Sequence, residues 1–177
     1  SILDLSTIPS NIMQTIAGCI LKITYDALYW GQNTLVGGKK QPLLVVLDEA
    51  HAYLKSGEDS ISSRTVQVIA KEGRKYGVGM LLVTQRPSEL DETVLSQCGS
   101  IIALRMTNTR DKGHVSSAMQ DELREMADVL SSLRTGEAII SGEAVRIPSR
   151  IKFFQADNAV KSSDPIPSKL WTTPDQR

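Results

Sequence analysis

Three continuous aliphatic runs constrain the fold of this chain more than any other feature of its sequence. They occupy residues 43–47 (LLVVL), 80–84 (MLLVT) and 101–106 (IIALRM), where apolar residues follow one another instead of alternating with polar ones. Such runs are typical of strands buried on both faces of a parallel sheet. Helical patterns fill the intervals between them. The sequence therefore predicts an α/β fold, with a mostly parallel sheet flanked by helices.

The expected helices share apolar residues at three-to-four spacing, and they cover 10–30, 61–75, 87–95, 110–118 and 120–132. Residues 1–5 (SILDL) predict a further short buried strand, stopped by Pro9. Residues 136–153 predict an antiparallel β-hairpin joined around Ser141 and Gly142. The prolines of residues 161–177 indicate an extended C-terminal arm, so we expect one domain over residues 1–160.

Composition excludes several classes of protein. The 177 residues carry 20 basic and 20 acidic side chains, and this zero net charge argues against a surface that coats nucleic acid with a positive field. No apolar run approaches the roughly 18 residues of a membrane span. Cys19 and Cys98 lie far apart in the sequence, with no metal-binding spacing around them, which indicates a cytoplasmic protein without disulfides or zinc.

Two adjacent carboxylates, Asp48 and Glu49, directly follow the first aliphatic run. Ligands of parallel α/β sheets bind at the carboxyl ends of the strands, so we expect chemistry there. This is the Walker B arrangement of nucleoside triphosphatases. In it, Asp48 would hold Mg²⁺ through water and Glu49 would polarise the water that attacks the γ-phosphate of ATP. The alternative is a helix N-terminus, where acidic residues are favoured by the helix dipole.

Two further polar residues are candidates for the same site. Gln85 follows the second run and is expected to contact the γ-phosphate or the attacking water, unless it is a solvated loop residue. Arg74 precedes that run between two glycines, and a guanidinium can pair with phosphate oxygens. We expect Arg74 on the same sheet edge as Asp48 and Glu49. The alternative is an ordinary cation near a helix C-terminus.

Three segments together resemble the C-terminal half of HerA-type ATPases: LLVVLDEAHAYL, IAKEGRKYGVGMLLVTQRPSELDETVLSQCGSIIALRMTN and GEAIISGEAVRIPSRI. These ATPases belong to the HerA/FtsK group of hexameric DNA-translocating motors, which have a RecA-like P-loop NTPase fold. The resemblance covers about residues 1–151. It implies that Asp48 and Glu49 are the Walker B pair and that Gln85 is the sensor. Arg74 matches an arginine that contacts the terminal phosphate.

The resemblance also implies cofactors and partners. They are ATP and Mg²⁺, a homo-hexamer around double-stranded DNA, and a nuclease or other effector enzyme in DNA processing or anti-phage defence. Lys55, Arg64 and the 55–63 loop are candidates for lining a DNA pore, with a plain surface loop as the alternative. No recognition-helix pattern or aromatic platform appears, so we expect contact with the DNA backbone.

The phosphate-binding loop of this family has no counterpart in the sequence. Residues 33–40 place Gly38 and Lys39 correctly, but Asn33 and Lys40 occupy positions that the G-x-x-x-x-G-K-[ST] motif reserves for Gly and Ser/Thr. They also precede a strand instead of following one. In the resembling family this loop lies upstream, and its strand lies between the strands expected at 79–84 and 101–106. We therefore expect the chain to be the Walker B part of the motor domain, without the Walker A strand and loop.

Three other interpretations remain open on sequence alone. The first is a non-catalytic, ring-forming assembly module that scaffolds an effector enzyme. The second is a superfamily 2 helicase, which shares the tetrapeptide at residues 48–51 (DEAH) but would be expected to carry Ser-Ala-Thr where residues 84–87 read TQRP. The third is an unrelated α/β enzyme with accidental motifs.

The missing loop generates a first prediction. The purified 177-residue chain should not hydrolyse ATP measurably, because it lacks the backbone amides and the lysine that cradle the β- and γ-phosphates. A phosphate-release assay checks this. Robust Mg²⁺-dependent turnover by the chain, abolished by Glu49→Gln, would contradict it.

Overall fold

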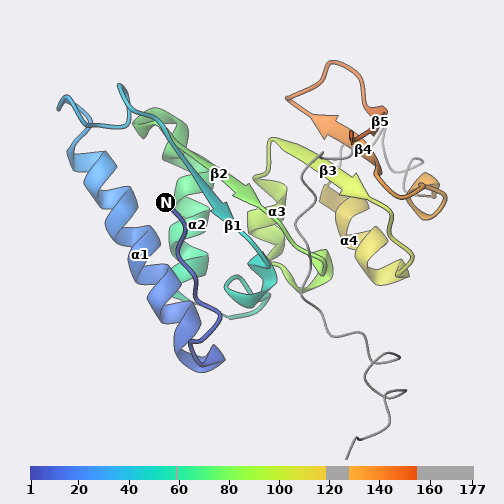
Figure 1. Ribbon diagram of the computed structural model, residues 1–177, viewed down its shortest axis with the longest axis horizontal. Helices are drawn as coiled ribbons and strands as arrows, with labels where there is room; N and C mark the ends of the chain where they lie inside the picture. The colour runs from blue at the N-terminus through green and yellow to red at the C-terminus, as the bar shows by residue number, and fades with distance from the viewer. Residues whose placement is uncertain (59, 119–127, 155–177) are drawn as a thin grey trace, which may run out of the picture.

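The computed structural model describes residues 1–58, 60–118 and 128–154 (Figure 1). Its strands and α-helices follow one another as α1 (Ser10–Trp30), β1 (Leu43–Leu47), α2 (Ile61–Glu72), β2 (Val78–Leu82), α3 (Glu92–Ser96), β3 (Ser100–Leu104), α4 (Thr109–Ala118), β4 (Glu137–Gly142) and β5 (Ser149–Lys152). Short 3₁₀ turns cover Ala50–Ala52, Gly73–Tyr76, Pro87–Glu89 and Val129–Ser131. The strands predicted from the three aliphatic runs and the predicted long first helix are confirmed.

The described strands form two sheets. β1 pairs with β2 in parallel, from Leu43 opposite Val78 to Leu47 opposite Leu82. β3, β4 and β5 form a second sheet in that order, and both of its pairings are antiparallel. The predicted β4–β5 hairpin is confirmed, although Ser141 and Gly142 lie inside β4 and residues 143–148 make the connection. The pairing of β3 with β4 was not predicted from the sequence.

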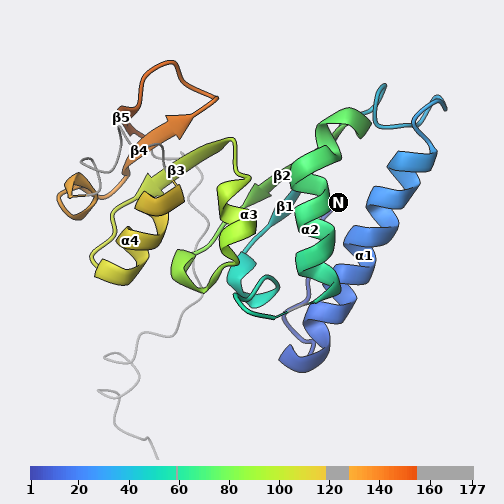
Figure 2. The same ribbon diagram turned by 180° about the vertical axis from the view of Figure 1, so that it is seen from behind.

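Helices α1 and α2 cover one face of the β1–β2 sheet (Figure 2). Leu21 of α1 and Val66 of α2 are buried against Val45 and Met80, which are the residues of β1 and β2 that point to that side. Ser60 begins α2, where its hydroxyl accepts a hydrogen bond from the backbone amide of Ser63 at 3.1 Å. The hydrophobic core on this side of β1 and β2 is therefore formed with these two helices.

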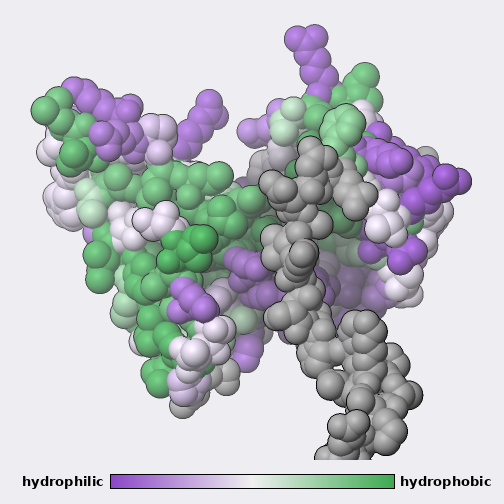
Figure 3. Space-filling model, viewed as in Figure 1, coloured by the Kyte–Doolittle hydropathy of each residue, from purple (hydrophilic) through white to green (hydrophobic). Residues whose placement is uncertain are grey.

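The opposite face of the strands is open. Leu44 and Val46 of β1 are 61% and 54% exposed, and Leu81 of β2 is 45% exposed. Figure 3 shows apolar residues gathered over this part of the molecule. The prediction of strands buried on both faces is therefore wrong for the described chain. Successive residues of a strand point to opposite faces of the sheet, and in β1 both sets are aliphatic. The described helices that pack on β1 and β2 nevertheless lie on one side of the sheet only.

Residues 1–5 do not form the predicted buried strand. Ile2 is 99% exposed and Leu3 is 61% exposed. A strand needs a hydrogen-bonded neighbour, and the described strands β1 to β5 pair only with one another. The predicted helix over 120–132 falls mostly, and the C-terminal arm over 161–177 entirely, outside the described residues. Within the described part, no helix is long and apolar enough to cross a membrane.

Two helical glycines allow the α1–α2 packing to be tested. A Cβ on Gly18 of α1 would lie 2.6 Å from the backbone nitrogen of Ser62, whereas a Cβ on Gly113 of α4 would meet nothing within 4 Å. We expect Gly18→Ala to destabilise the protein by about 1–3 kcal/mol, because the helices would have to separate. Gly113→Ala should stabilise it by up to about 1 kcal/mol through helix propensity. Denaturant unfolding measures the free energy of unfolding of both variants. Changes of the same sign in the two variants would contradict the close α1–α2 packing.

Candidate active site

The parallel register of β1 and β2 builds the site. Beyond the last paired residues, the Val83 amide donates to the Leu47 carbonyl at 2.9 Å, and the Ala50 amide donates to the Val83 carbonyl at 2.8 Å. These bonds hold the two chain segments together just past the ends of the strands. Asp48 and Glu49 therefore lie beside residues 84–86, as the strand-end reasoning predicts.

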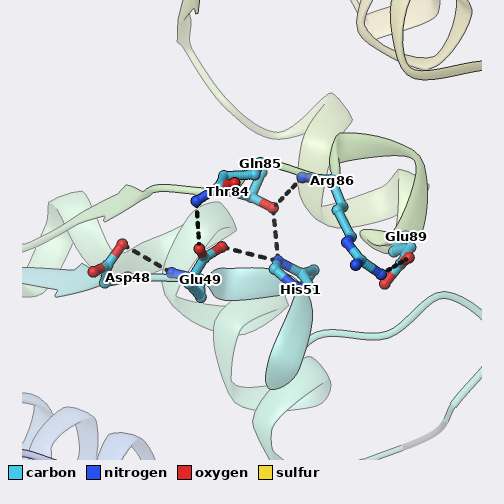
Figure 4. Close-up of polar contacts among 7 residues, drawn as sticks. All are labelled: Asp48, Glu49, His51, Thr84, Gln85, Arg86 and Glu89. Atoms are coloured by element: carbon cyan, nitrogen blue, oxygen red, sulfur yellow. Dashed lines mark hydrogen bonds and ion pairs between the residues drawn. The ribbon is translucent and has the colours of Figure 1, made fainter. Parts of the chain in front are cut away.

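Glu49 has an unusual backbone. Its φ of 48° and ψ of 48° lie in the left-handed region, and it is the only non-glycine residue with positive φ in the described chain. Its amide donates to Oδ1 of Asp48 at 3.0 Å. Such a conformation costs about 1–3 kcal/mol and persists where the surroundings impose it. Here it accompanies a side chain that turns toward β2, where Gln85 Nε2 donates to Glu49 Oε1 at 2.8 Å (Figure 4).

Sequence reasoning missed two residues that lie within this cluster, His51 and Thr84. His51 Nδ1 lies 3.0 Å from Thr84 Oγ1 and 3.3 Å from the second carboxylate oxygen of Glu49, Oε2 (Figure 4). Thr84 Oγ1 also accepts the Arg86 amide at 3.0 Å, and the Arg86 guanidinium pairs with Glu89 at 2.9 Å. The available signal was position, because Thr84 is the last residue of the second run and His51 lies two residues after Glu49.

Asp48 is the candidate for holding a divalent cation. Its side chain is exposed at the sheet edge, and one of its oxygens already accepts the Glu49 amide. In the described residues no group of three His, Cys, Asp or Glu side chains could hold a metal ion. A single exposed carboxylate fits Mg²⁺, which keeps several waters and binds through one or two carboxylates together with substrate phosphates.

Arg74 does not lie where the sequence analysis expected it. It belongs to the 3₁₀ turn that precedes β2, and it lines a hollow of about 450 Å³ together with Pro42 and Leu43 at the start of β1. Asp48 and Glu49 follow the other end of β1. The prediction that Arg74 lies on the same sheet edge as Asp48 and Glu49 is therefore wrong within one chain. The physical reason is strand direction: a residue just before a strand lies at its amino end, whereas a site at the carboxyl edge takes residues that follow strands.

Residues 31–41 also lie at this amino end. Gly38 packs so closely against the backbone of Tyr76 and Gly77 that a Cβ there would overlap it. The Gly77 carbonyl accepts the Leu43 amide at 2.8 Å, where the strands begin. The segment therefore packs against the protein backbone, in agreement with the conclusion that it is not a phosphate-binding loop.

The candidate DNA-binding residues are separate from this cluster. Lys55 is exposed, pairs with Glu58 at 3.9 Å and makes an isolated β-bridge with Leu90. Arg64 is exposed near the start of α2.

The fold and the site together define a class. The structure superposes on the genome packaging NTPase B204 from Sulfolobus turreted icosahedral virus 2, in its complex with AMPPCP, with a TM-score of 0.63 and 17% sequence identity over 78% of this chain and 63% of that chain. The chain therefore has the RecA-like fold of P-loop NTPases.

Sequence comparison identifies the family more narrowly. Residues 28–153 match the family model described as helicase HerA-like C-terminal, and the chain belongs to this family. The DNA double-strand break repair helicase HerA of Sulfolobus acidocaldarius is 34% identical over 171 residues, which are 97% of this chain and 34% of the relative. The protein of the same name from Pyrococcus furiosus is 40% identical over 113 residues, which are 64% of this chain and 20% of the relative. The chain thus spans about a third or less of the length of these relatives.

Proposed function

We propose that this chain is the Walker B part of a Mg²⁺-dependent ATPase that drives a HerA-type DNA translocase or helicase. One observation carries the proposal: in a chain of this family, Glu49 and Gln85 meet at 2.8 Å on the carboxyl edge of the parallel strands, beside the exposed Asp48. Ligands of parallel α/β sheets bind at this edge. The relatives are named as helicases, and the structural neighbour is a packaging NTPase in complex with a nucleotide analogue.

Each residue has a distinct role in the proposed reaction. Asp48 would hold Mg²⁺ through a water, and the ion would supply positive charge to neutralise the phosphates. Glu49 orients and polarises the attacking water. Gln85 reaches the same place from the neighbouring strand, so it orients Glu49 and can contact the water or the γ-phosphate. Residues from two strand ends thereby converge on one reacting centre.

The phosphate-binding part must come from outside these 177 residues. In the described chain β2 pairs only with β1, and β3 only with β4, so the sides of β2 and β3 that face each other carry no strand. We propose that the Walker A strand of the complete motor domain enters there and supplies the loop that cradles the phosphates. The open apolar face at Leu44, Val46 and Leu81 would also be covered in that complete domain.

The position of Arg74 supports a ring. Because it lies at the opposite end of β1 and β2 from Glu49, it cannot serve the nucleotide bound by its own subunit without a large rearrangement. In a head-to-tail ring, each subunit contacts the next through a different surface, so the amino end of one subunit's strands would be able to face the carboxyl edge of a neighbour. We propose that Arg74 contacts the γ-phosphate of a neighbour in a homo-hexamer, where it stabilises the charge that develops on transfer.

The remaining parts of the proposal concern partners. The ring would enclose double-stranded DNA through backbone contacts, with Lys55 and Arg64 as candidates. It would work in the cytoplasm with a nuclease or another effector enzyme in DNA processing or anti-phage defence. The alternative, a non-catalytic ring-forming scaffold, has no use for the strained Glu49 backbone or for the Gln85 donor that holds its carboxylate.

Substitutions in the Walker B pair test the proposed chemistry. In the complete protein, Glu49→Gln should retain ATP and Mg²⁺ binding but lose about 10²-fold or more in turnover, because an amide cannot polarise the attacking water as a carboxylate does. Asp48→Asn should instead raise the Mg²⁺ concentration needed for half-maximal activity. Steady-state ATPase assays with Mg²⁺ titration measure both. Near-wild-type hydrolysis by both variants would reject the Walker B assignment.

A second test concerns Arg74. In the complete ring, Arg74→Lys should leave folding and assembly intact and reduce ATPase activity at least about tenfold, because lysine lacks the planar fork that pairs with phosphate. Charge at a helix C-terminus alone is worth under about 1 kcal/mol, so a purely helix-capping role predicts almost no effect. Unchanged ATPase kinetics in Arg74→Lys would indicate that Arg74 only caps the helix.

Mixed rings decide which subunit Arg74 serves. Arg74→Ala subunits mixed with Glu49→Gln subunits should recover part of the lost turnover. Some sites would then combine an intact Glu49 with the intact Arg74 of a neighbour. No recovery at any mixing ratio, with mixed assembly verified, would show that Arg74 acts within its own subunit.

A further inference from the structure

His51 makes contacts that the proposed mechanism does not use. We propose that His51, anchored by Thr84, is a positioning residue that orients the Glu49 carboxylate toward the attacking water. The proposal rests on the function proposed above and adds to it a residue that acts through Glu49, without touching the nucleotide.

The two carboxylate oxygens of Glu49 have different neighbours. Gln85 Nε2 donates to Oε1 at 2.8 Å, whereas Oε2 is buried and makes no hydrogen bond within the described part of the chain. The polar atom that approaches Oε2 is Nδ1 of His51, at 3.3 Å. The His51 side chain is only 19% exposed, so protein contacts and not solvent determine its orientation (Figure 4).

Thr84 determines which tautomer of His51 fits. Its Oγ1 already accepts the Arg86 amide and lies 3.0 Å from the same Nδ1. A proton on Nδ1 can be donated to Thr84 Oγ1, and the positive end of the same N–H then lies near Glu49 Oε2. An unprotonated Nδ1 would place its lone pair near the carboxylate, which is repulsive. The arrangement therefore favours the Nδ1–H tautomer, in which His51 attracts the Glu49 carboxylate electrostatically without a hydrogen bond to it.

The consequence is a carboxylate fixed from two directions. Gln85 holds Glu49 from the end of β2, and His51 holds it from the turn that follows β1 while bonding to Thr84 across the two strand ends. Without His51, the carboxylate can rotate about its side-chain bonds and its oxygens lose their alignment. Misplacement by about 1 Å costs up to about 10²-fold in rate. The loss should appear in kcat and not in nucleotide affinity, because the side-chain contacts of His51 are with Thr84 and Glu49.

Two isosteric substitutions separate positioning from packing. In the complete protein, His51→Asn places an amide nitrogen at the position of Nδ1, whereas His51→Gln places one at the position of Nε2. We expect His51→Gln and His51→Leu to lower kcat about tenfold or more, and His51→Asn to stay within about threefold of wild type. Nucleotide Kd should be unchanged in all three variants. Thr84→Val should act like His51→Leu, while Thr84→Ser, which keeps the hydroxyl, should be mild.

The controls distinguish failure of this proposal from failure of the proposed function. His114, the other histidine of the chain, contacts Glu92 instead of the strand ends, so His114→Leu should leave kcat unchanged. Adding His51→Leu to Glu49→Gln should cause less than about a twofold further loss, because His51 acts through the missing carboxylate.

If His51→Leu turns over ATP at the wild-type rate, or if His51→Asn and His51→Gln lose equal activity, the positioning role is wrong while Glu49 can still be the base. A nucleotide-affinity defect in place of a kcat defect would also overturn it. If Thr84→Val is as active as wild type, His51 needs no anchor and the proposed pair fails even where a His51 variant does not fold. Wild-type turnover by Glu49→Gln alone would instead reject the proposed function.

Discussion

The parallel pairing of β1 with β2 is the interaction on which the rest of the site depends. Its register places Leu47 opposite Leu82, so the two chain segments end together and their next residues lie side by side. A shift of one residue would turn the side chains of one strand to the opposite face relative to the other strand and would separate Glu49 from Gln85. The carboxylate, the amide and the imidazole meet because this single ladder is aligned.

The same ladder gives the sheet two chemically different ends. Asp48 and Glu49 lie at the carboxyl end, and Arg74 lies at the amino end with the segment over residues 31–41. One subunit therefore carries two carboxylates at one end of the β1–β2 sheet and the Arg74 guanidinium at the other. The proposed head-to-tail ring would bring these two unlike ends together.

The sequence predicted those features that follow from local chemistry. Aliphatic runs predicted the three strands, and the strand-end rule predicted that Asp48, Glu49 and Gln85 lie together. Features that depend on distant partners were not predictable in this way. The buried strand expected at Ile2 and Leu3 lacks a described neighbour, and the β3–β4 pairing depends on residues far apart in the chain.

Three further differences have simple causes. Arg74 was misplaced because the rule for the carboxyl edge was applied to a residue that precedes its strand. The sequence indicated no role for His51, because its partner Thr84 lies 33 residues away in the chain. The two residues become neighbours only through the pairing of β1 with β2. The strands were expected to be buried on both faces because their residues are aliphatic on both. An aliphatic run does not show whether helices of the same segment cover both of those faces.

The central claim is that the two ends of one parallel ladder serve two different nucleotides. A structure of the complete assembly with a non-hydrolysable ATP analogue and Mg²⁺ tests it most directly. The account predicts that Asp48 and Glu49 of one subunit and Arg74 of the neighbouring subunit face the same γ-phosphate, with Glu49 beside Gln85. A γ-phosphate faced by Glu49 and Arg74 of the same subunit, or one that Glu49 does not approach, would contradict it.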